Sequence, residues 1–340
     1  MTPEQARIGA LVRFATAITV LNVLGHLVLG FEVTVLQSFV TALTCYACEI
    51  TLEIIGAWSE NRQPAFLGGG WKKFIIFLLP AHITGMATGM LIYDADSIFP
   101  FIFGAAVAIA SKAIFTVTVR GKSRHILNPS NTGILATVFL FPSVGAVFPY
   151  QFTQDLNGFW QWALPAIFIA SGTFLNSRFT KKMPLILAWL GGFVVQAVIR
   201  HYFFGGALAA SLLPMSGVAF LLFTFYMITD PQTSPSSVRG QIIFGLSLAA
   251  IYGVLMALHV FYAIFVALFI LCVFRGALLY VCELEPVRRV QLPAEWQWLT
   301  FGRPASLRGV PATSRDVMER VTPPSSDVSM MEGTGSMRPR

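Results

Sequence analysis

Two proline-containing turns hold many of the polar side chains that could bind a ligand. Residues 120–133 read Arg-Gly-Lys-Ser-Arg-His-Ile-Leu-Asn-Pro-Ser-Asn-Thr-Gly, and residues 228–237 read Ile-Thr-Asp-Pro-Gln-Thr-Ser-Pro-Ser-Ser. Each turn precedes an apolar segment, so Asn128 and Asp230 are expected to cap a helix start, with the following Pro in its first turn. Helix starts carry unpaired N–H groups and a partial positive charge, which favour electron-rich ligand atoms. The two turns are therefore candidate walls of a binding site.

Ionisable side chains inside apolar segments are the second set of candidates, because a charge within a membrane is costly. Glu49 and Glu53 lie four residues apart, hence on one helix face, and Glu53 is close enough to its segment end to lie among lipid headgroups. Lys112 either extends toward the membrane surface or supplies positive charge near the Asn128 turn. Glu49 and His82 are candidates for an ion or substrate pathway, although a satisfied interior histidine is the simpler interpretation of His82.

No catalytic or metal-binding motif accompanies these residues. Cys45 and Cys48 form a Cys-x-x-Cys pair, but no second Cys/His pair has matching spacing, so packing is the favoured interpretation and no metal site is expected. Walker A, HExxH and GxSxG sequences do not occur, and the three glycines at 68–70 are typical of a hinge or tight turn. Catalytic residues are therefore left unassigned.

The elements that must position these residues are membrane helices. The 340-residue chain is 55% hydrophobic and 11% charged, with a mean hydropathy of +0.69, whereas a soluble domain carries about a quarter charged residues. Segments of about 20 apolar residues can span a bilayer. They predict an all-α integral membrane protein of about ten transmembrane helices, near residues 11–30, 33–57, 73–92, 97–118, 130–150, 159–177, 183–202, 208–229, 238–256 and 258–281. Pro142 and Pro214 interrupt the fifth and eighth segments, which could be broken or re-entrant helices.

The distribution of Lys and Arg predicts the orientation of these helices. Cytoplasmic loops are enriched in both residue types, and an inward N-terminus leaves only Arg200 in the outer segments, together with Asp94, Asp96 and Asp155. Both termini are therefore expected in the cytoplasm. The net charge of +7 arises from the inner loops, so the lipid bilayer is the expected partner and no nucleic acid is needed.

Composition also predicts how the chain is divided. Residues 1–282 form the expected polytopic membrane domain, residues 283–304 an interfacial cytoplasmic segment, and residues 305–340 a disordered cytoplasmic tail rich in Pro, Ser, Arg and Glu. The two turns lie about 102 residues apart, which is compatible with a two-fold internal repeat of the kind that transporter-like folds often contain.

Both turns resemble sequences of the RnfD/NqrB family. The resemblance covers roughly residues 40–280 and includes Ser111-Lys112, Arg124-His-Ile-Leu-Asn-Pro-Ser-Asn-Thr-Gly133, and residues 213–218, 226–235 and 239–245. Residues 24–32, 79–85 and 171–180 look like a branch named UnbU, after genes found beside enediyne biosynthesis enzymes. The resemblance implies a transporter-like, NqrB/RnfD-like bundle in a bacterial inner membrane. It also implies other membrane or redox subunits as partners, because family members belong to ion-translocating, flavin-containing electron-transfer complexes.

The resemblance bears on two flavins. Members with covalent FMN carry it on a Thr in a long external segment, whereas here residues 148–158 are short and Thr153 lies in a different context, so covalent FMN is not expected. A second flavin, riboflavin held without a covalent bond, lies against the Asn-Pro turn in the family, which corresponds to Asn128, with His125 where several members have Asn. The resemblance thus implies non-covalent riboflavin or FMN, with cofactor-binding candidates Asn128, His125, Asn131, Lys112, Asp230 and Thr233. A role of Asn128 as a helix cap alone is the alternative.

Three functions remain open on these grounds. The first is membrane electron transfer linked to a biosynthetic pathway and supported by a bound flavin. The second is a non-redox permease for a small molecule or ion on the same scaffold, and the third is a membrane anchor for a biosynthetic assembly. In each ligand-binding case we expect Asn128, Asp230 and Lys112 to converge in one pocket reachable from the cytoplasm. As a lost cap, Asn128→Ala is expected to cost about 1 kcal/mol.

Overall fold

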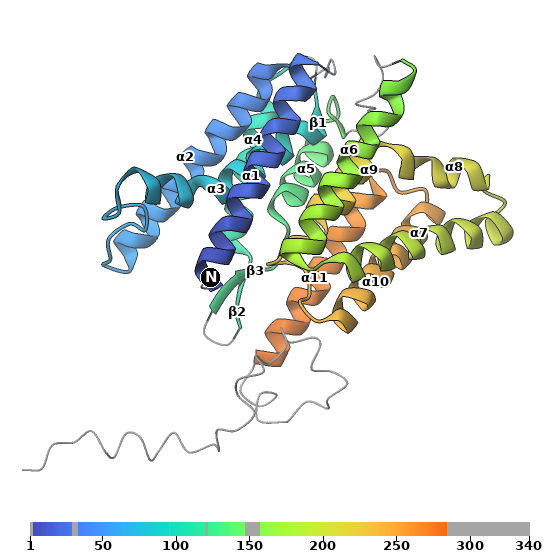
Figure 1. The fold of residues 1–340 in the computed structure, drawn as a ribbon. Helices are drawn as coiled ribbons and strands as arrows, with labels where there is room; N and C mark the ends of the chain where they lie inside the picture. Colours follow the sequence, from blue (N-terminus) through green and yellow to red (C-terminus); the bar gives the residue numbers. More distant parts are fainter. Residues whose placement is uncertain (1–2, 29–32, 95, 120–121, 147–156, 284–340) are drawn as a thin grey trace, which may run out of the picture. The chain divides into compact units, whose positions relative to one another are not determined.

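The described part of the chain is mostly helical (Figure 1). A computed structural model describes residues 3–28, 33–94, 96–119, 122–146 and 157–283, all within one unit of residues 1–302. The predicted segment 283–304, apart from Glu283, and the predicted tail 305–340 lie outside the described residues, as do Thr153 and Asp155.

Helices and strands follow one another in an order that matches the predicted apolar segments. The helical elements, in chain order, are α1 Pro3–Leu27, α2 Val35–Ser59, α3 Gly70–Leu91, α4 Phe99–Ile114, α5 Pro129–Leu140, α6 Phe159–Leu175, the π-helical η1 Asn176–Thr180, α7 Met183–Phe204, α8 Leu208–Leu212, the 3-10 helical η2 Leu213–Ser216, α9 Val218–Leu222, the π-helical η3 Phe223–Met227, α10 Val238–Ala257 and α11 Ala263–Glu283. The short strands are β1 Ile92–Tyr93, β2 Thr116–Val119, β3 Lys122–His125 and β4 Gly145–Ala146.

Within the described residues, five helices are long and apolar enough to cross a membrane alone, namely α2, α3, α7, α10 and α11. The segments 208–216 and 218–227 form a sixth if the bent pair is one span. By contrast, α4, α5 and α6 contain 16, 12 and 17 residues. Together these helices make the chain a multi-pass membrane protein, while the count of ten spans and the internal repeat stay predictions.

Both segments that contain the interrupting prolines are broken. Helix α5 begins directly after Asn128 and ends at Leu140, two residues before Pro142. Its 12 residues rise about 18 Å, short of the roughly 30 Å of bilayer hydrocarbon. In the other segment the chain bends by 67° between residues 216 and 218, where Pro214 lies in η2 and Gly217 joins it to α9. In each of these two segments, the helix therefore stops before the end of the predicted span.

An aromatic cluster holds the bent segment against its neighbours. Trp189 of α7 is completely buried and packs against Phe193, Phe220, Phe223 and Tyr252, with ring centroids 5.4–6.0 Å away. Its indole Nε1 donates a hydrogen bond of 3.0 Å to the Thr224 hydroxyl. Because buried aromatic contacts and a satisfied indole N–H favour one packing arrangement, this cluster fixes η3 relative to α7 and α10.

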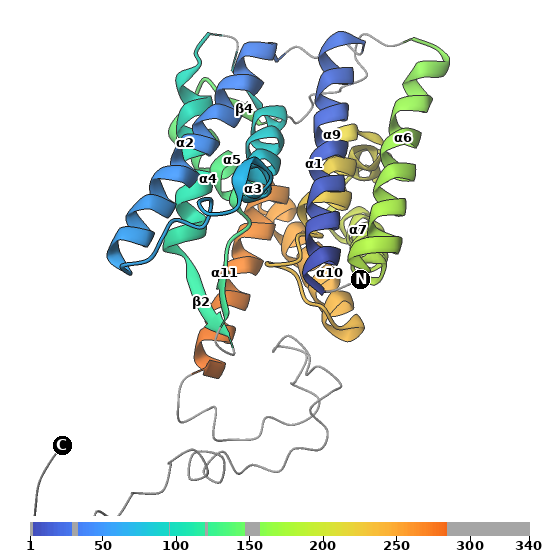
Figure 2. The ribbon, with the colours of Figure 1, turned by 60° about the vertical axis from the view of Figure 1, so that its left-hand side comes forward.

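Two short strand pairs interrupt the helices and were not anticipated by the all-α prediction. β1 pairs with β4, and β2 pairs with β3 in antiparallel register, with Thr116 opposite His125. Both views show the β2–β3 hairpin at the same end of the unit as the start of α1 (Figures 1 and 2). The hairpin reverses the chain between α4 and α5 and so delivers His125 to the start of α5.

Candidate functional site

Asn128 connects the two proline-containing turns directly. Its Oδ1 accepts hydrogen bonds of 3.0 Å from the Asn131 N–H and the Ser130 hydroxyl, which confirms its role as the cap of α5. Its Nδ2 donates a 3.0 Å hydrogen bond to the carbonyl of Met227, at the end of η3. The side chain is buried and both ends of its amide are occupied, so Asn128 is first of all a structural link between the turns.

Asp230, in contrast, begins no helix. The cap of α10 is Ser237, whose hydroxyl accepts from the Gly240 N–H, so the predicted capping role of Asp230 is wrong. Its Oδ1 instead accepts from the Gln232 N–H at 3.2 Å, and its carbonyl accepts from the Ser234 N–H at 3.0 Å. Such local bonds of Asp stabilise a turn in place of a helix start, and the chain needs seven more residues before α10 begins.

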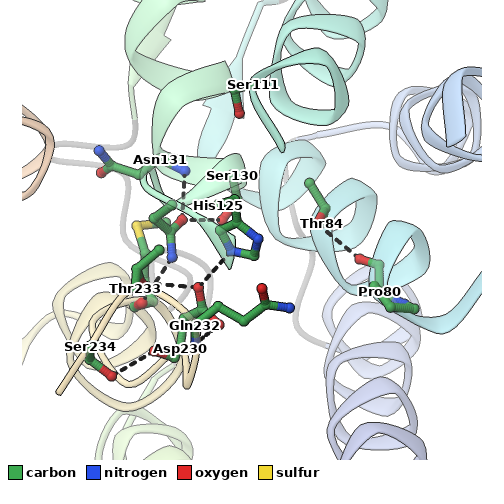
Figure 3. Close-up of polar contacts among 12 residues, drawn as sticks. Pro80, Thr84, Ser111, His125, Ser130, Asn131, Asp230, Gln232, Thr233 and Ser234 are labelled. Carbon is green, nitrogen blue, oxygen red and sulfur yellow. Dashed lines mark hydrogen bonds and ion pairs between the residues drawn. The ribbon is translucent and has the colours of Figure 1, made fainter. Parts of the chain in front are cut away.

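The Asp230 carboxylate faces His125, which lies at the end of β3 (Figure 3). The His125 Nε2 lies 3.3 Å from Asp230 Oδ2, and the Thr233 hydroxyl donates to the same oxygen at 3.0 Å. Burial raises the pKa of Asp230. The hydrogen bond and charge of His125, together with the hydrogen bonds from Gln232 and Thr233, lower it by more, so the pKa lies below its usual value. Asp230 is therefore an ionised acceptor at neutral pH.

A cavity of 1010 Å³ lies beside the two turns. Residues of α1, α2, α3, α4, the β2–β3 hairpin, α5, η3 and the Asp230 turn line it. Asn128, Asp230, Lys112, His125 and Glu49 are all among its lining residues, so the structure brings together the three residues expected to converge. Their predicted roles in binding stay predictions.

Three other predicted site residues do not line this cavity. Asn131 donates to the Phe265 carbonyl at 3.0 Å and points away from His125 and Asp230 (Figure 3). Thr233 acts on Asp230 through its hydroxyl, as described above. His82 lies between Thr19 and Tyr46, each of which forms a hydrogen bond with one of its ring nitrogens. Both ring nitrogens of His82 thus have hydrogen-bond partners, and its predicted place in an ion or substrate pathway stays a prediction.

Lys112 and Glu49 form an ion pair in the cavity wall. The Lys112 Nζ lies 2.8 and 3.0 Å from the two Glu49 carboxylate oxygens, and the side chains are only 17% and 19% exposed. Lys112 therefore adds no net charge to the Asn128 turn, because Glu49 offsets it. Glu53 is outside the cavity and instead pairs with Arg62.

Sequence reasoning missed two buried basic side chains that donate hydrogen bonds to backbone carbonyls of the Asp230 turn. Lys182 is 3% exposed, and its Nζ donates to the Pro235 carbonyl at 2.6 Å. Arg275 is also buried and donates to the Thr233 carbonyl at 2.8 Å. Burial, which outweighs the attraction of Asp230, lowers the pKa of Lys182 to about 8. The residue types gave no signal, because Lys182 is adjacent to a second Lys in an expected inner loop.

The cavity also has lining residues that the motifs did not indicate. Thr84 of α3 donates its hydroxyl to the Pro80 carbonyl at 2.9 Å. Gln232 lies between Asp230 and this part of α3 (Figure 3). Arg124, beside His125, lines the cavity too. The sequence offered only a weak indication of these residues, because Thr84 and Pro80 lie four residues apart in an ordinary apolar segment.

Comparison with known proteins relates this sequence to one kind of membrane protein. No family model matches the chain. It is 26% identical over 217 residues to the D subunit of the ion-translocating oxidoreductase complex from two strains of Vibrio vulnificus, YJ016 and CMCP6. The match covers 59% of this chain and 58% of each relative, so the chain spans less than two thirds of the relatives' length. This similarity supports a distant relationship to the RnfD/NqrB family and, with the apolar helices, a multi-pass membrane protein of that general kind.

Proposed function

We propose that this chain is a bacterial inner-membrane protein of the RnfD/NqrB kind that binds a flavin without a covalent bond and takes part in membrane electron transfer. The observation that carries the proposal is the convergence of the Asn128 turn and the Asp230 turn on one 1010 Å³ cavity. Ligand pockets usually measure about 300–1,000 Å³, so the cavity has room for a flavin. A more specific form of this proposal is that the chain belongs to the UnbU branch and serves a biosynthetic pathway. This form rests only on the short segments of similar sequence described above.

The lining residues suit the chemistry of an isoalloxazine ring. Such a ring has flat apolar faces and an edge of carbonyl oxygens, ring nitrogens and one N–H. In the cavity, Phe14, Phe77 and Tyr226 offer aromatic surface, while His125, Gln232 and other polar groups can donate or accept hydrogen bonds at the edge. Asp230 is the acceptor suited to the ring N–H. A bound flavin supplies the electron-transfer chemistry, and the protein sets its position and electrostatic environment.

The test is an absorbance spectrum of the protein purified in mild detergent from cells grown with added riboflavin. We expect a flavin spectrum at close to one flavin per chain, with all of the flavin released by denaturation. His125→Ala should lower the affinity at least tenfold. His201→Ala is the matched control, because His201 bonds to the Gly206 carbonyl and lies outside the cavity lining. A colourless protein that also fails to bind added riboflavin and FMN would refute the proposal.

One observation favours the permease as the second candidate. Residues of α3 from Lys72 to Leu91 line the cavity along most of the helix, a rise of about 29 Å at 1.5 Å per residue. A cavity of that length resembles a path as much as a cofactor site. A colourless protein whose cavity-lining variants alter solute movement into proteoliposomes would support this function instead.

A further inference from the structure

The cavity wall that α3 contributes changes from exposed and basic at one end to buried and apolar at the other. Lys72 and Lys73 lie in the first turn of α3 and are exposed. Met90 and Leu91, at the end of the same helix, are 2% and 3% exposed. All four line the cavity, and the α3 lining between them is apolar except for Thr84, whose hydroxyl bonds within its own helix. The cavity therefore has an exposed basic end and a buried apolar end.

Helix α1 adds a second apolar surface to this wall. Its lining residues recur every three or four positions and so share one helix face; they are Ile8, Leu11, Phe14 and Ile18. The Thr19 hydroxyl lies 2.7 Å from a ring nitrogen of His82, which joins the middle of α1 to the middle of α3. Two apolar helix faces along one cavity provide a site for a linear hydrocarbon chain.

Aromatic side chains place the exposed end at the level of the lipid headgroups. Trp58, at the end of α2, and Trp71, at the start of α3, are 80% and 72% exposed. Exposed Trp beside Lys and Arg is typical of the membrane–water interface. The loop 60–69 between these helices is held in place by Phe66, whose ring centroid lies 5.4 Å from that of Phe77 in α3. The basic end of the cavity therefore lies beside the headgroups, and the apolar end lies within the hydrocarbon.

The acidic side chains of the lining do not neutralise the basic end. Among the described lining residues the carboxylates are Glu49 and Asp230, and both bond to the partners given above. In the described part of the chain, neither Lys72 nor Lys73 forms an ion pair, and Lys73 donates to the Leu67 carbonyl at 2.8 Å. An ammonium group has three N–H donors, so Lys73 keeps two for a ligand. An excess of one charge attracts ligands of the opposite charge, and this end thus favours an anionic group.

The apolar part of the wall has the length of a fatty-acyl chain. Ile76 and Leu91, the first and last apolar residues of the α3 lining, are 15 residues apart, which is about 22 Å along the helix axis. An extended chain of about 18 carbons measures roughly 21 Å, over about 17 bonds of about 1.5 Å at tetrahedral angles. Figure 3 shows Thr84 across Gln232 from His125, so the α3 wall faces the two turns and is not part of them.

We propose that an anionic phospholipid of the surrounding bilayer, of the phosphatidylglycerol type, occupies this wall of the cavity. Its phosphate lies at Lys72 and Lys73, and one acyl chain runs along α1 and α3 toward Leu91, while the second chain stays in the bilayer. The inference goes beyond the proposed function. The acyl chain lies against α3, whereas the hydrogen-bonding groups assigned to the flavin come from the two turns.

Native mass spectrometry of the purified protein in a neutral detergent measures lipid binding directly. Phosphatidylglycerol and phosphatidylcholine with identical acyl chains are titrated separately. We expect one phosphatidylglycerol per chain, bound at least tenfold more tightly than phosphatidylcholine. Lys72→Ala/Lys73→Ala should weaken phosphatidylglycerol binding at least fivefold. Arg178→Ala/Arg239→Ala is the matched control, because it removes two exposed basic residues that are absent from the cavity lining and should keep the affinity.

A second pair of measurements tests the acyl chain without a change of charge. Ala87→Phe places a ring in the apolar wall and should weaken binding of both lipids at least fivefold. Its control is Val254→Phe, at an exposed position of α10 outside the cavity lining. Phosphatidylglycerol with short acyl chains gives the same test on the unchanged protein and should bind at least tenfold more weakly. Thermal unfolding of each variant checks that it is folded.

The outcomes separate this inference from the proposed function. Equal affinities for the two headgroups, or equal losses in the two double variants, would overturn recognition of the phosphate. Short-chain lipid that binds as tightly as long-chain lipid would overturn the acyl-chain site, and a retained free fatty acid in place of phospholipid would overturn the choice of occupant. The absorbance spectrum of the same samples reports flavin. Lipid bound by a protein that takes up no flavin keeps this inference and removes the proposed function, whereas flavin without lipid does the reverse.

Discussion

The sharpest consequence of the site geometry concerns Asn128. Viewed only as a helix cap, the residue is worth about 1 kcal/mol. The structure gives its amide a second task, the 3.0 Å hydrogen bond from Nδ2 to the Met227 carbonyl. Asn128→Ala removes both, and an unsatisfied buried polar group costs about 1–3 kcal/mol. Because the same carbonyl also accepts a longer bond of 3.4 Å from the Asp230 N–H, the lower part of that range applies. We therefore expect a total loss of roughly 2–3 kcal/mol.

A second substitution separates the two tasks. Serine is as good a helix cap as asparagine but has no donor that reaches as far as the amide. Asn128→Ser should therefore keep the cap of α5 and lose only the bond to Met227, at a cost of roughly 1–2 kcal/mol. The alanine variant should be less stable than the serine variant by about 1 kcal/mol, which is the value of the cap.

Thermal unfolding in detergent measures this difference. Cys45 and Cys272 are buried, so their reaction with a thiol-reactive dye reports loss of the fold. At about 2 °C per kcal/mol for a unit of this size, the alanine variant should unfold roughly 4–6 °C below the parent and the serine variant roughly 2–4 °C below it. Equal midpoints for alanine and serine would refute the cap. An alanine variant within 1 °C of the parent would refute the link between the turns.

Three further predictions follow from the same contacts. Lys112→Ala should destabilise the fold by about 1–3 kcal/mol, less than a fully buried pair, and the double variant Lys112→Met/Glu49→Gln should recover part of that loss in the same dye assay. Burial lowers the pKa of Lys182 to about 8, so between pH 8 and 10.5 the unfolded chain binds more protons than the folded one. The free energy of unfolding should therefore rise by up to about 3 kcal/mol across this range. Lys182→Met should remove this rise. A Cβ at Gly133 would overlap the carbonyl oxygen of a glycine on α4, whereas nothing lies within 4 Å of a Cβ at Gly191; Gly133→Ala should therefore lower the yield of folded protein and Gly191→Ala should not.

The membrane helices were accessible from sequence because their signal is local. An apolar run of sufficient length must be helical in lipid, where no water satisfies the backbone, and every predicted segment contains helix in the structure. Pro142 and Pro214 also indicated the two broken segments correctly. The strand pairs were missed because β2 and β3 contain four residues each, too few for a periodic pattern to be recognised.

Pairing between distant residues was much less accessible. The bond between Asn128 and Met227 joins residues 99 positions apart, and the pair of Lys112 with Glu49 joins residues 63 apart. Charge and residue type indicated that Lys112 and Glu49 were unusual within the membrane, but they could not indicate that the two neutralise each other. For Asp230, the dipeptide Asp-Pro predicted a helix start, and the local bonds of the carboxylate produced a turn instead.

The polar residues of the two turns are largely used by the backbone around them, and this affects what similarity in these turns can mean. Breaking a helix inside a membrane leaves carbonyls that lipid cannot satisfy. Here Asn128 and Asn176 donate to carbonyls of the π-helical η3, at Met227 and Phe225. Lys182 and Arg275 do the same for carbonyls of the Asp230 turn. Proteins that share this broken-helix scaffold must keep such side chains whatever they bind. Similarity in the turns is therefore evidence for the scaffold, and the choice of ligand depends on side chains with no such task.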